Sequence, residues 1–134
     1  MMIQTYQGAC HCGRVSFEVP ADLNYVVDCN CSICRRTGAF WHPAAETDLR
    51  ILAGEADLAL YQFNTKTAKH YFCRQCGIHP FIRPRLDPGR WAFNARCIDG
   101  IDLSSIKVRP FDGQNWEATA ATYRERLKKK PPAA

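Results

Sequence analysis

Two short stretches, Cys10-His11-Cys12-Gly13 and Cys73-Arg74-Gln75-Cys76-Gly77, decide how this chain folds. Each places two cysteines with at most two residues between them, a spacing at which neighbouring thiolates share one metal ion. Each ends in a glycine, whose freedom to adopt positive φ lets the backbone curl so that its amides point at sulfur. We therefore predict two zinc knuckles that meet in a closed structural site, with four ligands: Cys10, Cys12, Cys73 and Cys76.

A third cluster, Cys29-Asn30-Cys31-Ser32-Ile33-Cys34, differs from these two. Arg35-Arg36-Thr37 follows it in place of a glycine, and no second cysteine pair remains in the chain to complete a four-thiolate site. Three protein ligands, with a fourth position left for water or substrate, are typical of a catalytic zinc. We predict such a site at Cys29, Cys31 and Cys34, and hence two Zn²⁺ ions per chain.

Two other uses of the cysteines stay open. A disulfide framework needs an oxidising compartment, whereas Met1-Met2-Ile3-Gln4-Thr5-Tyr6 shows no signal peptide, and a bridge across one residue is strained. An iron–sulfur cluster at the third cluster would depart from the bacterial and plant-type ferredoxin spacings. The thiol pattern therefore favours zinc in a cytoplasmic protein.

We expect one zinc-binding domain over residues 1–127 and a basic, disordered tail over residues 128–134. The formal charge of +5 suggests a nucleic-acid partner, but seven bound thiolates and two Zn²⁺ ions would lower it to about +2. No helix-turn-helix, RNA-recognition or finger pattern accompanies the charge. Since no apolar stretch reaches the ~20 residues of a membrane helix either, we expect neither nucleic acid nor a membrane as partner.

Apolar residues recur with a period of two along most of the chain, which predicts an all-β fold of short strands separated by turns. The clearest strand covers residues 14–19, where Val15, Phe17 and Val19 share one face and Pro20 is expected to end it. The other predicted strands cover residues 25–29, 49–52, 58–63, 68–73, 80–83, 90–95 and 107–110.

Near the C-terminus the period becomes helical. An apolar stripe recurs at i, i+4, i+7 and i+11, and its members are Trp116, Ala120, Tyr123 and Leu127. Asn115 is placed to cap the helix. The expected fold is therefore mainly β with one short C-terminal helix.

The cysteine segments also resemble a known family, the glutathione-dependent formaldehyde-activating enzymes, or GFA family, which includes centromere protein V. The resemblance spans about three-quarters of the chain and lies in cysteine order and spacing, in Gly8-Ala9-Cys10-His11-Cys12-Gly13-Arg14-Val15-Ser16-Phe17, Cys29-Asn30-Cys31-Ser32-Ile33-Cys34-Arg35 and Tyr71-Phe72-Cys73-Arg74-Gln75-Cys76-Gly77. It implies a β-tent fold. It also implies a structural zinc at Cys10, Cys12, Cys73 and Cys76 and a catalytic zinc at Cys29, Cys31 and Cys34, the partition that the glycines predict.

The resemblance implies that glutathione and formaldehyde combine to S-hydroxymethylglutathione, a carbon–sulfur lyase equilibrium. A glutathione thiol that entered the open position of the three-cysteine site would lose its proton and be placed to attack an aldehyde carbon. Because three thiolates give that site a net charge of −1, activation of the nucleophile is favoured over polarisation of the carbonyl. The alternative is a non-catalytic zinc-stabilised binding module, in which both ions only hold strands together.

Arg35, directly after the third cluster, is expected to offset the negative charge or to hold a substrate carboxylate. A surface arginine that meets only solvent or a nearby acid is the alternative.

The histidines and the eighth cysteine have less decisive positions. His11 lies between two ligating cysteines, so we expect its side chain at the surface. His79, three residues after the second knuckle, is either an acid/base at the open zinc or a structural histidine at a strand end. His42 and His70 are expected to pack beside aromatic neighbours. Cys97 is an inert core thiol, a fourth ligand for the second zinc or a redox-active partner.

Overall fold

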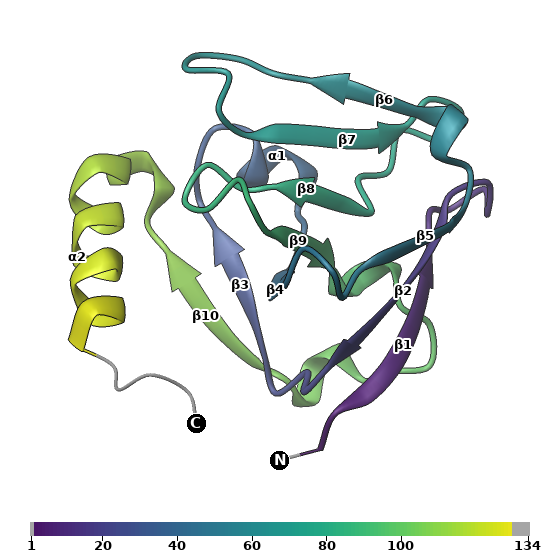
Figure 1. The fold of residues 1–134 in the computed structure, drawn as a ribbon, viewed down its shortest axis with the longest axis horizontal. Helices are drawn as coiled ribbons and strands as arrows, with labels where there is room; N and C mark the ends of the chain where they lie inside the picture. The colour runs from purple at the N-terminus through teal and green to yellow at the C-terminus, as the bar shows by residue number, and fades with distance from the viewer. Residues whose placement is uncertain (1, 130–134) are drawn as a thin grey trace.

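The computed structural model describes residues 2–129, as a mainly β protein with one C-terminal helix, and confirms the predicted fold class (Figure 1). The smaller sheet has the strand order β1 (Gln4–Ala9), β2 (Ser16–Ala21), β5 (Arg50–Ala53). The larger sheet has the order β10 (Lys107–Phe111), β3 (Tyr25–Cys29), β4 (Trp41–Ala44), β9 (Trp91–Asn94), β8 (Phe81–Arg83), β7 (Lys69–Cys73), β6 (Leu58–Tyr61). The helices are α1 (Cys34–Thr37) and α2 (Trp116–Lys129), and the 3-10 turns are η1 (Glu55–Asp57), η2 (Ala95–Cys97), η3 (Leu103–Ser105) and η4 (Gly113–Asn115).

The hydrophobic core lies between the two sheets. Phe17 and Val19 of β2 are fully buried, as the period-two pattern predicts. The Phe17 ring lies 5.7 Å from the Phe81 ring of β8 and 6.2 Å from the Phe93 ring of β9. Burying one such side chain stabilises the fold by about 1.5–3 kcal/mol. Aromatic contacts at the centre of the molecule therefore hold the small sheet against the large one.

Every predicted strand is present, with ends shifted by at most two residues, and two further strands are present that the pattern did not predict. One is β1, an edge strand that is mostly exposed and is held by its antiparallel pairing with β2 rather than by an apolar face. The other is β4, which contains Pro43 and pairs with β9. The polar residues of β1 and the proline of β4 depart from the usual strand signals, so the apolar pattern did not predict these two strands.

The expectation that Pro20 ends its strand is wrong, because β2 continues to Ala21. On one side of β2, Pro20 lies opposite Thr5 of β1. On the other side, pairing with β5 involves only Ser16, Phe17 and Glu18. Pro20 therefore lies where β2 has become an edge strand, and an edge tolerates the missing N–H group.

Helix α2 begins at Trp116, the first residue of the predicted stripe. Ala120 is buried and Trp116 is half-buried beneath the Arg85 guanidinium, 3.7 Å from the ring centroid, but Tyr123 and Leu127 are exposed. The expected cap role of Asn115 is wrong: this residue lies in η4, and its side-chain amide donates a hydrogen bond of 2.8 Å to Asp112 Oδ2. Within residues 2–129, no helix combines the length and the apolar character needed to cross a membrane.

The single domain over residues 1–127 stays a prediction. Of the predicted basic tail, residues 128 and 129 lie in α2, and residues 130–134 lie outside the described residues.

Candidate metal centres

The four knuckle cysteines lie together in space, although about sixty residues separate the pairs along the chain. The Sγ atoms of Cys10, Cys12, Cys73 and Cys76 are all within 4.8 Å of one another. Cys12 Sγ lies 3.6 Å from both Cys10 Sγ and Cys73 Sγ. Thiolates about 2.3 Å from one tetrahedral ion are about 3.8 Å apart, so these distances fit a shared metal.

The backbone around this group has the conformation that the two glycines predict. Gly13 has φ +82° and Gly77 has φ +78°, and a side chain at either position would meet open space. The N–H group of Gly13 donates to Cys10 O at 3.1 Å, and that of Gly77 donates to Cys73 O at 2.8 Å. Val15 N lies 3.4 Å from Cys10 Sγ and donates to it. These glycines are therefore required by backbone conformation, which turns amides toward sulfur.

The four-cysteine group joins the two sheets. Cys10 directly follows β1 of the small sheet, and Cys73 ends β7 of the large sheet. Both side chains are buried, whereas Cys76 is half-buried and Cys12 is exposed. A metal ion here would therefore link two layers of the fold at the edge of the core.

The three-cysteine group has a different setting. Cys29 ends β3, Cys34 begins α1, and their Sγ atoms and that of Cys31 all lie within 4.8 Å of one another. Cys34 N donates to Cys31 Sγ at 3.4 Å. The single turn of α1 ends at Gly38, which has φ +71° and donates to Cys34 O at 2.9 Å. One strand end and one short helix therefore bring the three sulfurs together.

The three thiols act electrostatically as one unit. Hydrogen bonds from Cys29 and Cys34 lower the pKa of Cys31, so the group loses its first proton more easily than an isolated thiol. The bond with Cys31 raises the pKa of Cys29 to about 11, and bonds with Cys29 and Cys31 raise the pKa of Cys34. The raised pKa values oppose loss of a second and a third proton from the group. A bound cation would remove this opposition, because a coordinating thiol is deprotonated outright.

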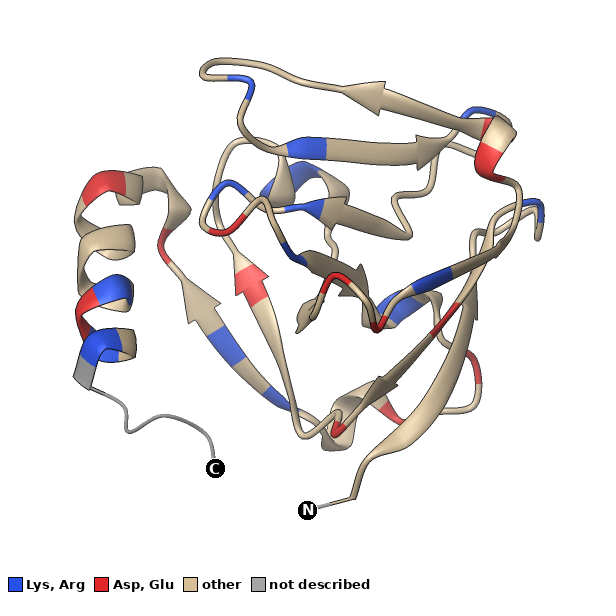
Figure 2. Cartoon of the chain, in the orientation of Figure 1, with Lys and Arg blue, Asp and Glu red and all other residues tan. Residues whose placement is uncertain are grey.

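The charged side chains near this group have both signs. The helix that follows it carries Arg35 and Arg36, whereas Asp28 precedes its first cysteine in β3. Figure 2 shows basic positions on α1 and acidic positions at the end of β3 and in the turn before α2. Arg36 Nη1 donates to Ser32 O at 2.7 Å, so its guanidinium is engaged with the cysteine loop itself. Arg35 is exposed, and its side chain has no hydrogen-bond or ion-pair partner among residues 2–129.

The two faces of the large sheet pack in two different buried clusters. On β8 and β9, Ile82 and Ala92 pack in one buried cluster with Cys34 and Trp41. The neighbouring residues in the sequence, Phe81 and Trp91, belong instead to the main core. Successive side chains of a strand point to opposite faces. The three-cysteine group therefore lies on the face of the sheet that is turned away from the small sheet.

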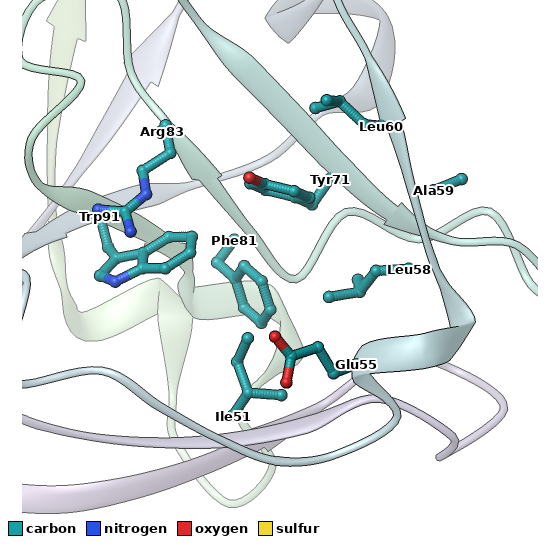
Figure 3. A pocket seen from close by; sticks show the side chains of 9 residues that line it. All are labelled: Ile51, Glu55, Leu58, Ala59, Leu60, Tyr71, Phe81, Arg83 and Trp91. Carbon is teal, nitrogen blue, oxygen red and sulfur yellow. The ribbon is translucent and has the colours of Figure 1, made fainter.

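A hollow of about 320 Å³ lies on the other face, between the large sheet and β5. Figure 3 shows its walls, with the rings of Tyr71, Phe81 and Trp91 on one side and the Glu55 carboxylate pointing toward them. The Arg83 guanidinium lies 3.5 Å from the Trp91 ring centroid and is bound by Glu46. No cysteine lines this hollow, so it is separate from both metal-ligand groups.

A row of aromatic side chains leads from the edge of the sheet toward the three cysteines. Tyr61 of β6 lies opposite His70 of β7, which lies opposite Ile82 of β8. The Phe63 ring stacks on both Tyr61 and His70, at 5.7 Å in each case. Tyr61 and Phe63 are exposed, whereas Ile82 packs against the cysteine cluster. The row is a partly exposed surface that ends at the candidate site.

The segment between β10 and α2 also belongs to this neighbourhood, and sequence reasoning missed it. Asn30, between two of the cysteines, forms hydrogen bonds with Phe111, Asp112 and Gln114. Gly113 lies so close to Cys29 that a side chain there would collide with its sulfur. The signal in the sequence is only an Asp-Gly pair after a strand, which indicates a turn but not what the turn contacts.

The structure places the histidines away from direct ligand positions. His11 is exposed, as predicted. His42 and His70 are buried beside aromatic rings, which confirms their prediction: His42 lies 4.7 Å from Tyr25 and donates from Nδ1 to its carbonyl at 2.9 Å. His79 is half-buried with its ring 5.4 Å from the Phe72 ring, and burial together with nearby His70 lowers its pKa.

Cys97 is buried in the main core, in η2, and is outside both groups of neighbouring thiols. Burial raises its pKa to about 12, which keeps the thiol protonated and unreactive. Its position matches the inert core thiol among the three uses considered. The seven other cysteines form two groups with the membership predicted for the metal sites, and metal binding by them stays a prediction.

Comparisons with known proteins agree with these observations. The family model of glutathione-dependent formaldehyde-activating enzymes matches residues 5–117. A curated protein of Halomonas elongata, provisionally named a glutathione-dependent formaldehyde-activating enzyme, is 32% identical over 94 residues, which cover 63% of this chain and 57% of that protein. The chain thus spans little more than half the length of this relative.

Similarity extends to a solved structure. A crystal structure of a Rhodobacter sphaeroides protein is 38% identical to this chain and superposes with a TM-score of 0.71, over 77% of this chain and 99% of that one. The match to the family model covers most of the chain and includes all seven clustered cysteines. The chain therefore belongs to the glutathione-dependent formaldehyde-activating enzyme family and has its mainly β, β-tent fold, with cysteine clusters whose arrangement is consistent with zinc knuckles.

Proposed function

We propose that this protein is a zinc-dependent carbon–sulfur lyase that interconverts a thiol and an aldehyde with their adduct, of which S-hydroxymethylglutathione is the example suggested by the family name. The three-cysteine group carries this proposal. Its three sulfurs are close enough to share an ion, and among residues 2–129 no histidine, aspartate or glutamate joins them as a fourth ligand. A site of this kind leaves room for an outside ligand.

The residues present fit two zinc ions. Cys10, Cys12, Cys73 and Cys76 would hold a structural ion, because four thiolates complete its tetrahedral shell. Cys29, Cys31 and Cys34 would hold the second ion. When bound there, zinc would keep a substrate thiol in its deprotonated, nucleophilic form.

The overall reaction balances without an oxidant or reductant. The carbon–sulfur bond forms, the carbonyl π bond breaks, and the thiol proton ends on the former carbonyl oxygen. The chain must therefore bind the thiol and orient it toward the aldehyde carbon, and orientation of this kind is a major source of rate enhancement. The reverse direction releases the aldehyde by the same path.

Two features around the three cysteines support a substrate role. Arg35 is exposed next to Cys34 and has a guanidinium free to bind a carboxylate, a group that glutathione carries. The row of Tyr61, Phe63 and His70 offers a partly exposed surface beside the site. Substrate parts that do not react would bind at these two places and fix the position of the reacting sulfur.

The direct test is the exchange of formaldehyde between its free form and S-hydroxymethylglutathione, followed by NMR exchange spectroscopy with and without the protein. We expect catalytic amounts of the zinc-loaded protein to accelerate the exchange and Cys34→Ser to abolish the acceleration. Cys97→Ser is the matched control, because Cys97 is buried but belongs to neither group, and it should retain the activity. A zinc-loaded parent that leaves the exchange rate unchanged would favour the non-catalytic binding module.

A further inference from the structure

Two segments that are far apart in the sequence meet beside the three cysteines. Strands β3 and β10 are parallel neighbours, and Cys29 at the end of β3 lies opposite Phe111 at the end of β10. Both strands therefore stop at the same edge of the sheet. The turn that follows β10, residues 112–115, must then lie beside the cysteine loop that follows β3.

Asn30 is the residue at which the two segments are joined. Its backbone N–H group donates to Phe111 O at 3.1 Å, which extends the strand pairing by one step. Its side-chain Nδ2 donates to Asp112 Oδ1 at 3.0 Å, and its Oδ1 accepts from Gln114 N at 3.0 Å. Gln114 Nε2 donates in turn to Asn30 O at 3.1 Å.

All four groups of Asn30 that can donate or accept are thus engaged with residues 111–114. Each exposed hydrogen bond contributes little to stability by itself. Four bonds on one residue, however, restrict its position and orientation together. Because Asn30 lies between Cys29 and Cys31, the direction of both neighbouring side chains is restricted as well.

Gly113 lies beside the Cys29 sulfur. A Cβ atom added there would lie 2.7 Å from Cys29 Sγ and 2.7 Å from Cys31 Cβ, closer than real Cβ atoms approach any atom. Unlike Gly13 and Gly77, it does not have positive φ. The two knuckle glycines are required by backbone conformation, whereas Gly113 is required by lack of space against the ligands.

We propose that residues 111–114 form a clamp on the three-cysteine site, with Asn30 and Gly113 as positioning residues that hold Cys29 and Cys31 in ligand geometry. This inference rests on the proposed function only in requiring a metal ion at the three cysteines. Partners that orient metal ligands from outside the first coordination shell typically affect metal affinity by about 10–100-fold. The clamp would make the start of the C-terminal helical segment a part of the site.

The first test compares two glycine variants by metal content and affinity, measured by zinc titration with a chromophoric chelator as competitor. Gly113→Ala forces Cys29 or the turn to move, so we expect zinc at the three-cysteine site to bind at least tenfold more weakly, while zinc at the four-cysteine site is retained. Gly89→Ala is the matched control, because its Cβ would meet only Asp87 Oδ1 at an ordinary 3.6 Å. Parent-like zinc binding at both sites in Gly113→Ala would overturn the inference.

A second test does not depend on a clash. Asn30→Asp places a carboxylate against that of Asp112, and the hydrogen bond between these two side chains is lost. The double variant Asn30→Asp/Asp112→Asn reverses donor and acceptor and restores the bond. In the cobalt-substituted protein, we expect the single variant to alter the thiolate-to-cobalt charge-transfer spectrum of the three-cysteine site and the double variant to recover it.

A general loss of stability would not produce this pattern, since the parent and the double variant both carry one carboxylate and one amide at the exposed positions 30 and 112, only exchanged between them. Identical cobalt spectra in the parent and both variants would contradict the clamp. Failure of the proposed function would give a different result. A parent that binds two ions but does not accelerate formaldehyde exchange would contradict the proposed enzyme activity but not the clamp. A parent with a single ion would overturn both.

Discussion

The two cysteine groups of this protein differ in their position and role in the fold. The four-cysteine group draws one pair from each sheet and uses Gly13 and Gly77 to turn the backbone around sulfur. The three-cysteine group lies at the end of a single strand, begins a one-turn helix and packs against an already buried cluster that includes Trp41 and Ile82. The first group joins layers of the fold, whereas the second lies on a surface that the fold has already built.

Loss of metal should therefore have different consequences at the two places. A structural zinc site can contribute about 10–16 kcal/mol of binding energy to folding, which is comparable to the whole stability of a small domain. At the three-cysteine group, neighbouring strands are paired through β4, β9 and β8 without any contribution from sulfur. We expect the first ion to determine whether the domain folds and the second to determine what it does.

The largest effect should follow from Cys73→Ser. Cys73 is fully buried, ends β7 and lies 3.6 Å from Cys12 Sγ. The change removes a thiolate from the closed shell, so we expect the structural ion to be lost and the domain to unfold at 25 °C. Circular dichroism and thermal unfolding measure this directly, and a cooperatively folded variant with near-parent stability would contradict the joint role of this group.

Cys34→Ser, in contrast to Cys73→Ser, should change metal content and thiol binding but leave the domain folded. Cys34 is buried beside Trp41 and Ile82, so a serine hydroxyl without a partner there costs about 1–3 kcal/mol of stability. The domain should remain folded. We expect one zinc ion per chain in place of two, and no binding of added thiol. If Cys34→Ser and Cys73→Ser lost equal stability, the division between a structural and a functional site would be wrong.

Chelator treatment should separate the sites in time. The three-cysteine site has one protein ligand fewer, so its ion should leave first, with unchanged far-ultraviolet circular dichroism. The second, slower phase should coincide with unfolding, because it removes the ion between the sheets. Two kinetic phases of zinc release with one phase of unfolding are expected, and the simultaneous loss of both ions with structure would count against this account.

The smallest effect should be seen on substrate binding. Arg35→Ala removes an exposed guanidinium worth about 1 kcal/mol, so we expect the KM for the glutathione adduct to rise about fivefold with kcat nearly unchanged. Arg36→Ala is the matched control, since Arg36 is bound to Ser32 O, and its KM should change less than twofold. Equal effects of the two variants would show that Arg35 has no special contact with substrate.

Much of this architecture could be predicted from local patterns. Alternation at Val15, Phe17 and Val19 indicated a half-buried strand because β2 presents one face to the core. The glycines after Cys12 and Cys76 separated the knuckles from the third cluster, since only a knuckle needs positive φ at that point. These features depend on a few consecutive residues, and a sequence shows them directly.

The parts that escaped prediction depend on distant pairing. Strand β1 is recognisable only beside β2, and Pro20 is tolerated only because β5 pairs with no more than the first half of β2. The clamp at Gly113 follows from the parallel pairing of β3 with β10, some eighty residues apart. No local pattern reports which segment a turn will contact, so the sequence alone predicted no role for Asn30.

The most direct measurement is the number and thiol accessibility of the bound ions in one sample. In the cobalt-substituted protein, we expect two ions per chain, and titration with glutathione should increase the thiolate-to-cobalt charge transfer of one ion with a stoichiometry of one. The Cys34→Ser protein should show one ion and no response. Two ions that both ignore added thiol would contradict the claim that the protein leaves one of its sites a ligand short.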